Sequence, residues 1–140
     1  MSFTLDLTKF ATKANADIKL VIQKISMEAF KRIIYRTPVD TGRARANWGC
    51  TIGKPRTGMQ VESTDKSGAA TTAAMVATVQ GIKGDGSVFL VNNVPYIHEL
   101  EKGSSQKSPQ GMVGVTLIEM IGITGRRETL MSLKAATRAE

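Results

Sequence analysis

A long amphipathic segment near the N-terminus constrains the fold of this chain more than any other feature of its sequence. Between residues 8 and 36, apolar side chains recur at spacings of three and four, which predicts one helix with a single apolar stripe. Thr8 can cap its start, and Pro38 ends it because the residue before a proline is disfavoured in the helical region. The stripe consists of Phe10, Ala14, Ile18, Val21, Ile22, Ile25, Ala29 and Ile33.

The length of this predicted helix bears on what its stripe can pack against. At about 1.5 Å per residue, residues 8–36 would extend about 43 Å. A globular domain of 140 residues is only about 37 Å across. We therefore expect the helix either to kink or to project, and a projecting stripe would be covered by a neighbouring subunit.

The rest of the chain is predicted to contain short strands and short helices. Residues 47–52 and 88–91 favour strands, residues 69–82 favour an Ala-rich helix, and residues 96–101 favour one helical turn. Residues 111–121 fit a helix or a strand, because their apolar residues satisfy both periodicities. The first strand would place on one face Trp48, Cys50 and Ile52.

Together these segments predict an α+β fold. The long N-terminal helix would pack on a small, mainly antiparallel β-sheet, accompanied by the Ala-rich second helix. Residues 1–122 would form this single domain, and residues 123–140 a C-terminal helix or tail that could become ordered only in an assembly.

Composition indicates a soluble protein made in a reducing cytoplasm. Cys50 is the only cysteine, which excludes an intramolecular disulfide. The first residues include Asp6 and do not resemble a secretory signal. The longest apolar stretch, residues 112–123, is too short to span a bilayer and contains Glu119.

The residues that could carry enzyme chemistry do not form a known pattern. His98 is the only histidine, and Lys102 stands where a zinc-protease helix needs its second histidine. Cys50 as a nucleophile would need a base, and only that histidine could serve. Residues 53–58 have the glycine spacing of a phosphate loop, but Met59 stands where its lysine belongs. We therefore predict no catalytic, cofactor or metal site.

Positive charge is concentrated in one segment. The chain carries a net charge of +7, and in residues 31–56 seven basic residues face one acidic residue, Asp40. Such density suits sequence-independent contact with a DNA backbone, or a solvated face with salt bridges between subunits. The candidate residues for a DNA channel or an interface are Arg36, Arg43, Arg45, Lys54 and Arg56.

Two separate segments resemble one known family. Residues 36–48 read RTPVDTGRARANW and residues 92–113 read NNVPYIHELEKGSSQKSPQGMV. In this order and separation they resemble the neck and tail-component proteins of tailed phages typified by HK97 gene product 10, over residues 3–121. Departures from the family pattern are Ala44 and the Ile97-His98 pair. The motif residues are Thr41, Gly42, Arg43, Asn47, Trp48, Asn93, Pro95, Tyr96, Glu101, Gly103, Gly111 and Met112.

The resemblance implies a non-enzymatic structural virion protein at the head–tail interface. Proteins of this family form rings of about six subunits around the DNA channel. Expected partners are copies of the chain, the head connector or stopper, and the tail terminator or tail tube. The alternatives are a tail terminator or another tail-tube-proximal ring protein, and a basic nucleic-acid-binding regulator.

Three structural hypotheses follow for the motif residues. Gly42 would permit a sharp turn that places Arg43 and Arg45 at the start of a strand. Arg43 would pair with Glu101, within one subunit or across a ring interface. The isolated protein would be a monomer or a weak oligomer, because virion rings assemble on a template.

Overall fold

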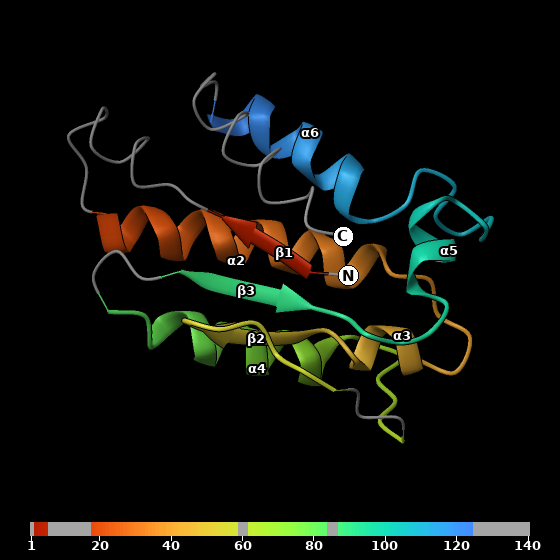
Figure 1. Ribbon diagram of the computed structural model, residues 1–140. Coiled ribbons are helices and arrows are strands. Elements are labelled where there is room, and N and C mark those ends of the chain that lie inside the picture. Colours follow the sequence, from red (N-terminus) through yellow and green to blue (C-terminus); the bar gives the residue numbers. More distant parts are fainter. Residues whose placement is uncertain (1, 6–17, 59–61, 84–86, 125–140) are drawn as a thin grey trace.

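A three-stranded sheet and a layer of three helices form the two layers of the molecule. The computed structural model describes residues 2–5, 18–58, 62–83 and 87–124 (Figure 1). Their arrangement confirms the predicted α+β class. The elements in chain order are β1 (Ser2–Leu5), α2 (Ile18–Arg36), α3 (Arg43–Ala46), β2 (Gly49–Ile52), α4 (Ala69–Gln80), β3 (Val88–Val91), α5 (Ile97–Glu101) and α6 (Val113–Thr124).

The sheet has the order β1-β3-β2, and both pairings are antiparallel. Val91 of β3 lies opposite Ser2 of β1 and Gly49 of β2. β1 was not predicted. Its partner, β3, lies far along the chain, so the pairing depends on the tertiary fold.

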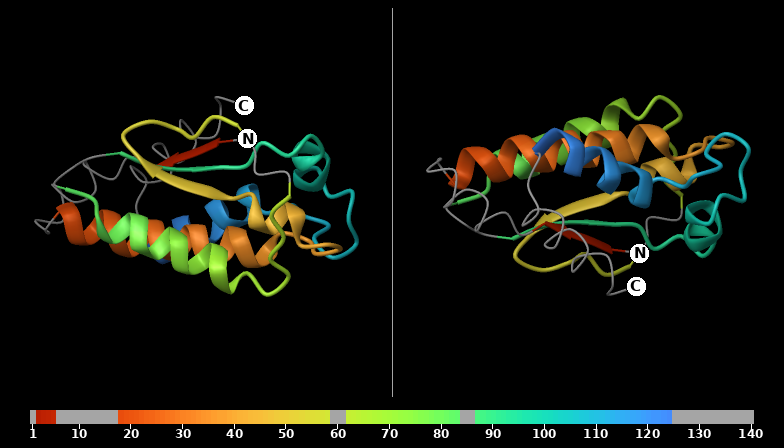
Figure 2. Two further views of the ribbon diagram at one scale, coloured as in Figure 1. Left: turned by 90° about the horizontal axis from the view of Figure 1, so that it is seen from below. Right: turned by 90° about the horizontal axis from the view of Figure 1, so that it is seen from above.

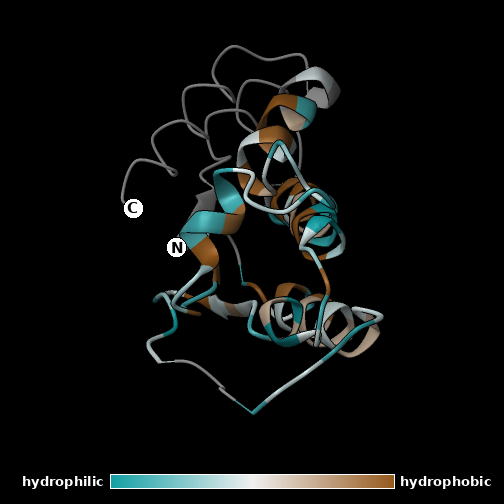
Figure 3. Cartoon of the chain, turned by 90° about the vertical axis from the view of Figure 1, so that its right-hand side faces the viewer, coloured by the Kyte–Doolittle hydropathy of each residue, from teal (hydrophilic) through white to brown (hydrophobic). Residues whose placement is uncertain are grey.

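The helix layer is built around α2. α4 and α6 lie on opposite sides of α2, and the sheet packs against one face of this three-helix layer (Figure 2). The end-on view shows the same stacking, with α6 above α2 and α4 below (Figure 3). The predicted apolar stripe is confirmed over the described part of α2, where Ile22, Ala29 and Ile33 are buried in the core.

The described part of α2 does not project from the molecule. It contains 19 residues, so it is about 28 Å long and lies along the sheet (Figure 1). Its end at Arg36, shortly before Pro38, confirms the predicted termination. Residues 8–17, including Thr8, Phe10 and Ala14, lie outside the described residues.

The remaining elements follow the sequence pattern with local corrections. β3 has the predicted bounds, and α4 buries Met75 and Val79 as expected. β2 begins at Gly49 instead of residue 47, and Ile52 at its end is 39% exposed. Of the ambiguous segment 111–121, residues 113–121 are helical and belong to α6. The predicted C-terminal helix or tail, residues 123–140, lies outside the described residues from residue 125 onward.

Candidate functional site: the motif junction

The two segments that carry the family resemblance fold against each other at one end of the molecule. We call residues 36–48 and 92–113, with the contacts between them, the motif junction. The first segment follows α2 and contains α3, and the second contains α5 and leads into α6 (Figure 1). Most of the motif residues have an internal role there.

A buried tryptophan ties the end of α2 to the start of β2. Trp48 donates a hydrogen bond from Nε1 to Oγ1 of Thr37 at 2.7 Å, and both residues are buried. The Thr37 hydroxyl donates to the carbonyl oxygen of Ile33 at 2.8 Å. A buried indole N–H needs such a partner, so Trp48 anchors the first motif segment.

The residues after Gly42 form a helical turn, and the prediction that they begin a strand is wrong. Arg43 and Arg45 lie on α3, which Gly42 precedes with a φ of 90°. The exposed Thr41 accepts a hydrogen bond at Oγ1 from the backbone N–H of Arg43 at 3.2 Å. Buried Asn47 donates from Nδ2 to the Arg43 carbonyl oxygen at 2.7 Å. These local bonds compete with strand pairing and favour the turn.

Gly42 is required by close packing as well as by its backbone angle. A Cβ at this position would lie 2.8 Å from the backbone nitrogens of Asp65 and Lys66. The Gly42 carbonyl oxygen accepts hydrogen bonds from the backbone N–H groups of Ala46 and Asp65, each at 3.0 Å. The loop before α4 is therefore fixed against the first motif segment.

Asp65 holds the start of α4. Its carboxylate accepts hydrogen bonds from the backbone N–H of Gly68 at 3.0 Å, and from the N–H and hydroxyl of Thr71 at 2.9 and 2.8 Å. Desolvation acts to raise the pKa of Asp65. The hydrogen bonds from Thr71 and Gly68 outweigh it and lower the pKa below its ordinary value.

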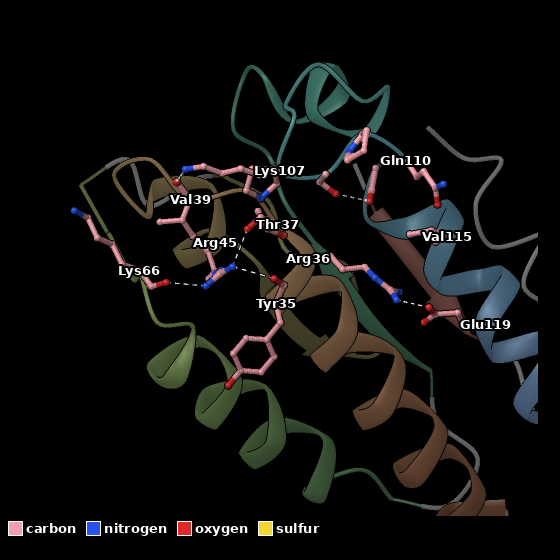
Figure 4. Close-up of a pocket in the computed structure, with 14 residues that line it drawn as sticks. Tyr35, Arg36, Thr37, Val39, Arg45, Lys66, Lys107, Gln110, Val115 and Glu119 are labelled. Atoms are coloured by element: carbon pink, nitrogen blue, oxygen red, sulfur yellow. Dashed lines mark hydrogen bonds and ion pairs between the residues drawn. The ribbon is translucent and has the colours of Figure 1, made fainter.

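Arg45 binds three carbonyl oxygens around the end of α2 (Figure 4). Its guanidinium donates to the carbonyls of Tyr35 and Thr37 at 2.9 Å and to that of Lys66 at 2.7 Å. It also lies over the Tyr35 ring, 5.9 Å from the centroid. A cation at the C-terminus of a helix is favourable, so Arg45 joins this helix end to the loop before α4.

The second motif segment meets the first through a buried asparagine. Asn92 donates from Nδ2 to the Ala44 carbonyl oxygen at 2.7 Å and accepts from the Val94 N–H at 3.2 Å. The Arg43 guanidinium lies over the ring of the exposed Tyr96, 5.8 Å from its centroid. The two segments are therefore one structural unit.

Glu101 caps the start of α6. Its carboxylate accepts hydrogen bonds from the backbone N–H groups of Met112, Val113 and Gly114 at 3.1, 2.9 and 3.0 Å. A carboxylate is favoured at a helix N-terminus, and this cap explains why residues 113–124 are helical. Inside the subunit the Glu101 carboxylate thus binds these N–H groups and the Arg43 guanidinium lies over Tyr96, and a link between Arg43 and Glu101 across a ring interface stays a prediction.

Two glycines close the loop between α5 and α6. Gly103 and Gly111 have φ angles of 90° and 79°. A Cβ on Gly103 would overlap the carbonyl oxygen of Pro109, and one on Gly111 would overlap that of Glu101. Both motif glycines are needed for the backbone to pass this closely. Buried Met112 follows directly.

The predicted basic residues are mostly engaged inside the molecule. Arg36 donates to Oγ1 of Thr116 at 2.8 Å and forms an ion pair with Glu119, which also binds Arg32 at 2.8 Å. Arg36 and then Arg32 hold the pKa of Glu119 below its ordinary value. Arg56 donates to the carbonyl oxygen of Asn47 at 2.5 Å, and burial lowers its pKa. Lys54 is exposed.

A cavity of about 660 Å³ opens between the end of α2, the α5–α6 loop and α6 (Figure 4). Lys107 crosses its rim, where Nζ donates to the carbonyl oxygen of Val39 at 2.5 Å. The cavity is lined by four cations and one carboxylate: Arg36, Arg45, Lys66, Lys107 and Glu119.

Within the described residues, those considered for enzyme chemistry are not arranged as a metal site. Among the described residues, no group of three His, Cys, Asp or Glu residues could hold a metal ion. His98 is exposed on α5. Burial raises the pKa of the Cys50 thiol to about 12, which keeps it protonated. No helix within the described ranges is long and apolar enough to cross a membrane.

Three internal contacts of the motif junction depend on residues that sequence reasoning did not select. These three residues are Asn92, Asp65 and Lys107. Asp65 has no local signal of a helix start, because it lies three residues before the N-cap position, Gly68, where a capping aspartate is expected. Asn92 directly follows β3, but its neighbour Asn93, which is exposed, was selected instead.

Comparisons of the chain with protein-family models, with curated proteins and with solved structures found no match.

Proposed function

We propose that this chain is a non-enzymatic structural virion protein of a tailed bacteriophage. It forms a ring at the neck, where it joins the tail to the head connector around the DNA channel. The observation that carries this proposal is the motif junction. The two segments with the family resemblance interlock through Asn92 and Ala44 and through Arg43 and Tyr96.

A joining protein benefits from surfaces that are formed before assembly. Each flexible side chain or loop that a partner must order reduces the affinity of the complex. In the motif junction, Gly103 and Gly111 fix the α5–α6 loop, and Glu101 fixes the start of α6. The rigid end of the molecule is therefore suited to contact a connector or a tail protein without rearrangement.

The internal bonds of the arginines change what we propose for the basic segment. Arg45 and Arg56 donate from their terminal guanidinium nitrogens to neutral carbonyl oxygens, which leave the positive charge of both side chains in place. Lys54 and Lys66 are exposed. We therefore propose sequence-independent attraction of the DNA backbone by exposed lysines, strengthened by the fixed arginines.

Depletion of the protein during phage growth tests this role. With the gene carrying a nonsense mutation, we expect filled heads and complete tails that remain separate. Purified protein added to that lysate should join them and restore infectivity. Normal virions without the protein would contradict the proposal.

The same experiment separates the alternatives. Abnormally long tails in the depleted lysate would indicate the tail terminator instead. Tight binding of the purified chain to one duplex sequence at physiological salt would indicate the nucleic-acid-binding regulator.

A further inference from the structure

The two outer helices of the helix layer carry almost no charge. α4 contains no charged residue among its twelve positions, and α6 contains only Glu119. Glu119 is bound by Arg32 and Arg36 of α2 in the same subunit. In a chain with 22% charged residues, two helix surfaces of this kind indicate burial against protein.

α6 presents an apolar side to solvent. It buries Thr116 and Met120, while Gly114, Ile118 and Gly122, spaced four residues apart, are exposed. The Ile118 side chain is 71% exposed, more than the other large hydrophobic residues that the structure describes as exposed. A helix that is apolar on several sides is usually buried.

α4 presents a smooth surface of matching character. It buries Thr71, Met75 and Val79, and its exposed side consists largely of alanines. Short side chains let another helix approach closely, and a branched side chain such as Ile118 fits between them. The exposed alanines are Ala69, Ala70, Ala73, Ala74 and Ala77.

We infer that α6 of one copy docks against α4 of the next copy. This inference rests on the proposed ring and names the surfaces that build it. Because α4 and α6 lie on opposite sides of α2 (Figure 2), the contact joins two different surfaces. Such a head-to-tail contact closes into a ring when its rotation closes.

Charge matching favours a second copy over a foreign partner. Neither surface carries an unpaired charged group, so the contact buries no unpaired charge. Of the cations of the motif junction, Arg36 at the end of α2 is already paired with Glu119 of α6, and Arg43 and Arg45 lie on α3. An acidic partner attracted by the net charge of +7 would bind the cations of the motif junction instead.

The contact between α6 and α4 is small, as expected for copies that associate stably only within a closed ring. Each helix has twelve residues and is about 18 Å long. One helix pair of this length buries much less than the roughly 800 Å² per partner that a stable interface needs. Two isolated copies would therefore associate weakly, and neighbouring contacts with the virion would stabilise the closed ring.

Cysteine cross-linking of the full-length chain tests this contact. Cys50 is first replaced by alanine, and Ile118→Cys and Ala73→Cys are then introduced together. Oxidation at rising protein concentration should give a ladder of covalent dimers, trimers and larger species. Each single-cysteine variant should give none, since the contact joins unlike surfaces. The control pair combines Ile118→Cys with Lys54→Cys, outside the helix layer.

Three outcomes of this experiment would overturn the inference. The first is a ladder no stronger than that of the control pair. The second is dimerisation of the Ile118→Cys variant alone, which would mean that α6 pairs with α6. The third is protection of the thiol of the Ile118→Cys variant from a maleimide reagent in dilute protein, which would mean that the chain's own residues cover this face. We expect fast labelling in dilute protein.

A charged substitution gives a second readout. Ile118→Asp should weaken self-association at least about tenfold, because burying one isoleucine is worth at least that factor. Ile52→Asp, on β2, is the matched control and should leave association unchanged. If Ile118→Asp still joins heads to tails and forms rings, the docking inference fails and the neck role stands. If the variant with Ile118→Cys and Ala73→Cys cross-links but the protein is dispensable for joining, the neck role fails instead.

Discussion

The motif junction and the outer helices of the helix layer differ in how they use their side chains. In the motif junction, charged and polar groups are turned inward, as when Arg45 binds three carbonyl oxygens and Glu101 caps α6. On α4 and α6 the exposed side is apolar, and Ile118 points to solvent. Several charged residues of the motif junction thus stabilise this chain, and the surfaces that we propose for a neighbouring copy are uncharged.

The largest expected effect comes from the glycines of the α5–α6 loop. Gly103→Ala should lower the free energy of unfolding by about 3 kcal/mol or more, because a positive φ and overlap with Pro109 add together. Gly53→Ala is the control, since its φ is 87° but no atom lies within 4 Å. It should cost only about 1 kcal/mol. Urea denaturation measures both, and equal losses would contradict the packing role.

The adjacent asparagines sharpen the comparison inside the motif junction. Asn92→Ala should cost about 2 kcal/mol, because it removes the donor at 2.7 Å from the Ala44 carbonyl oxygen and the acceptor of the buried Val94 N–H. Asn93→Ala should stay within about 0.5 kcal/mol, since Asn93 is exposed. Thermal unfolding of the two variants checks this order, and a larger loss for Asn93→Ala would reverse it.

The cap on α6 is expected to have an intermediate effect. Glu101→Ala should cost about 1–2 kcal/mol, because three N–H groups at the start of α6 lose their acceptor. Glu99→Ala on the same helix is the control, since Glu99 is exposed. Circular dichroism and urea denaturation provide the measurement. Indistinguishable variants would mean that the cap contributes little.

Acid should weaken the start of α4. The pKa of Asp65 is lowered in the folded protein, so its contribution is present above its unfolded pKa of about 4. That contribution is lost as the pH falls through the folded pKa. Asp65→Asn should therefore destabilise the protein at pH 7 and reduce the loss of stability between about pH 5 and pH 3. An unchanged pH profile would contradict this role.

The smallest effect on the monomer is expected at Ile118. Ile118→Ser should change the free energy of unfolding by less than about 0.5 kcal/mol, because the side chain is mostly exposed. Met120→Ala, on the buried side of α6, should cost about 2–5 kcal/mol. The pair thus distinguishes the outward side of α6 from its core side, and similar losses would show that α6 has no free face.

The sequence was sufficient where the signal is local. The apolar stripe of α2, the break at Pro38, the alanines of α4 and the short apolar run of β3 each follow from neighbouring residues. The α+β class follows from these elements.

The parts that the sequence could not predict depend on contacts between distant residues. β1 needs β3 to pair with, and α6 is selected over a strand by the carboxylate of Glu101. The arginines were interpreted as an exposed cluster because their carbonyl partners belong to other loops. Tertiary packing sets the direction of a side chain in such a loop, and the periodicity of apolar residues in the sequence does not predict it.

A cryo-EM reconstruction of the neck of the intact virion tests the central claim most directly. We predict a closed ring of this chain between connector and tail, with α6 of each copy against α4 of the next and the positive charge of the motif junction toward the DNA channel. Absence of the chain from the neck, or its presence only elsewhere in the particle, would contradict it.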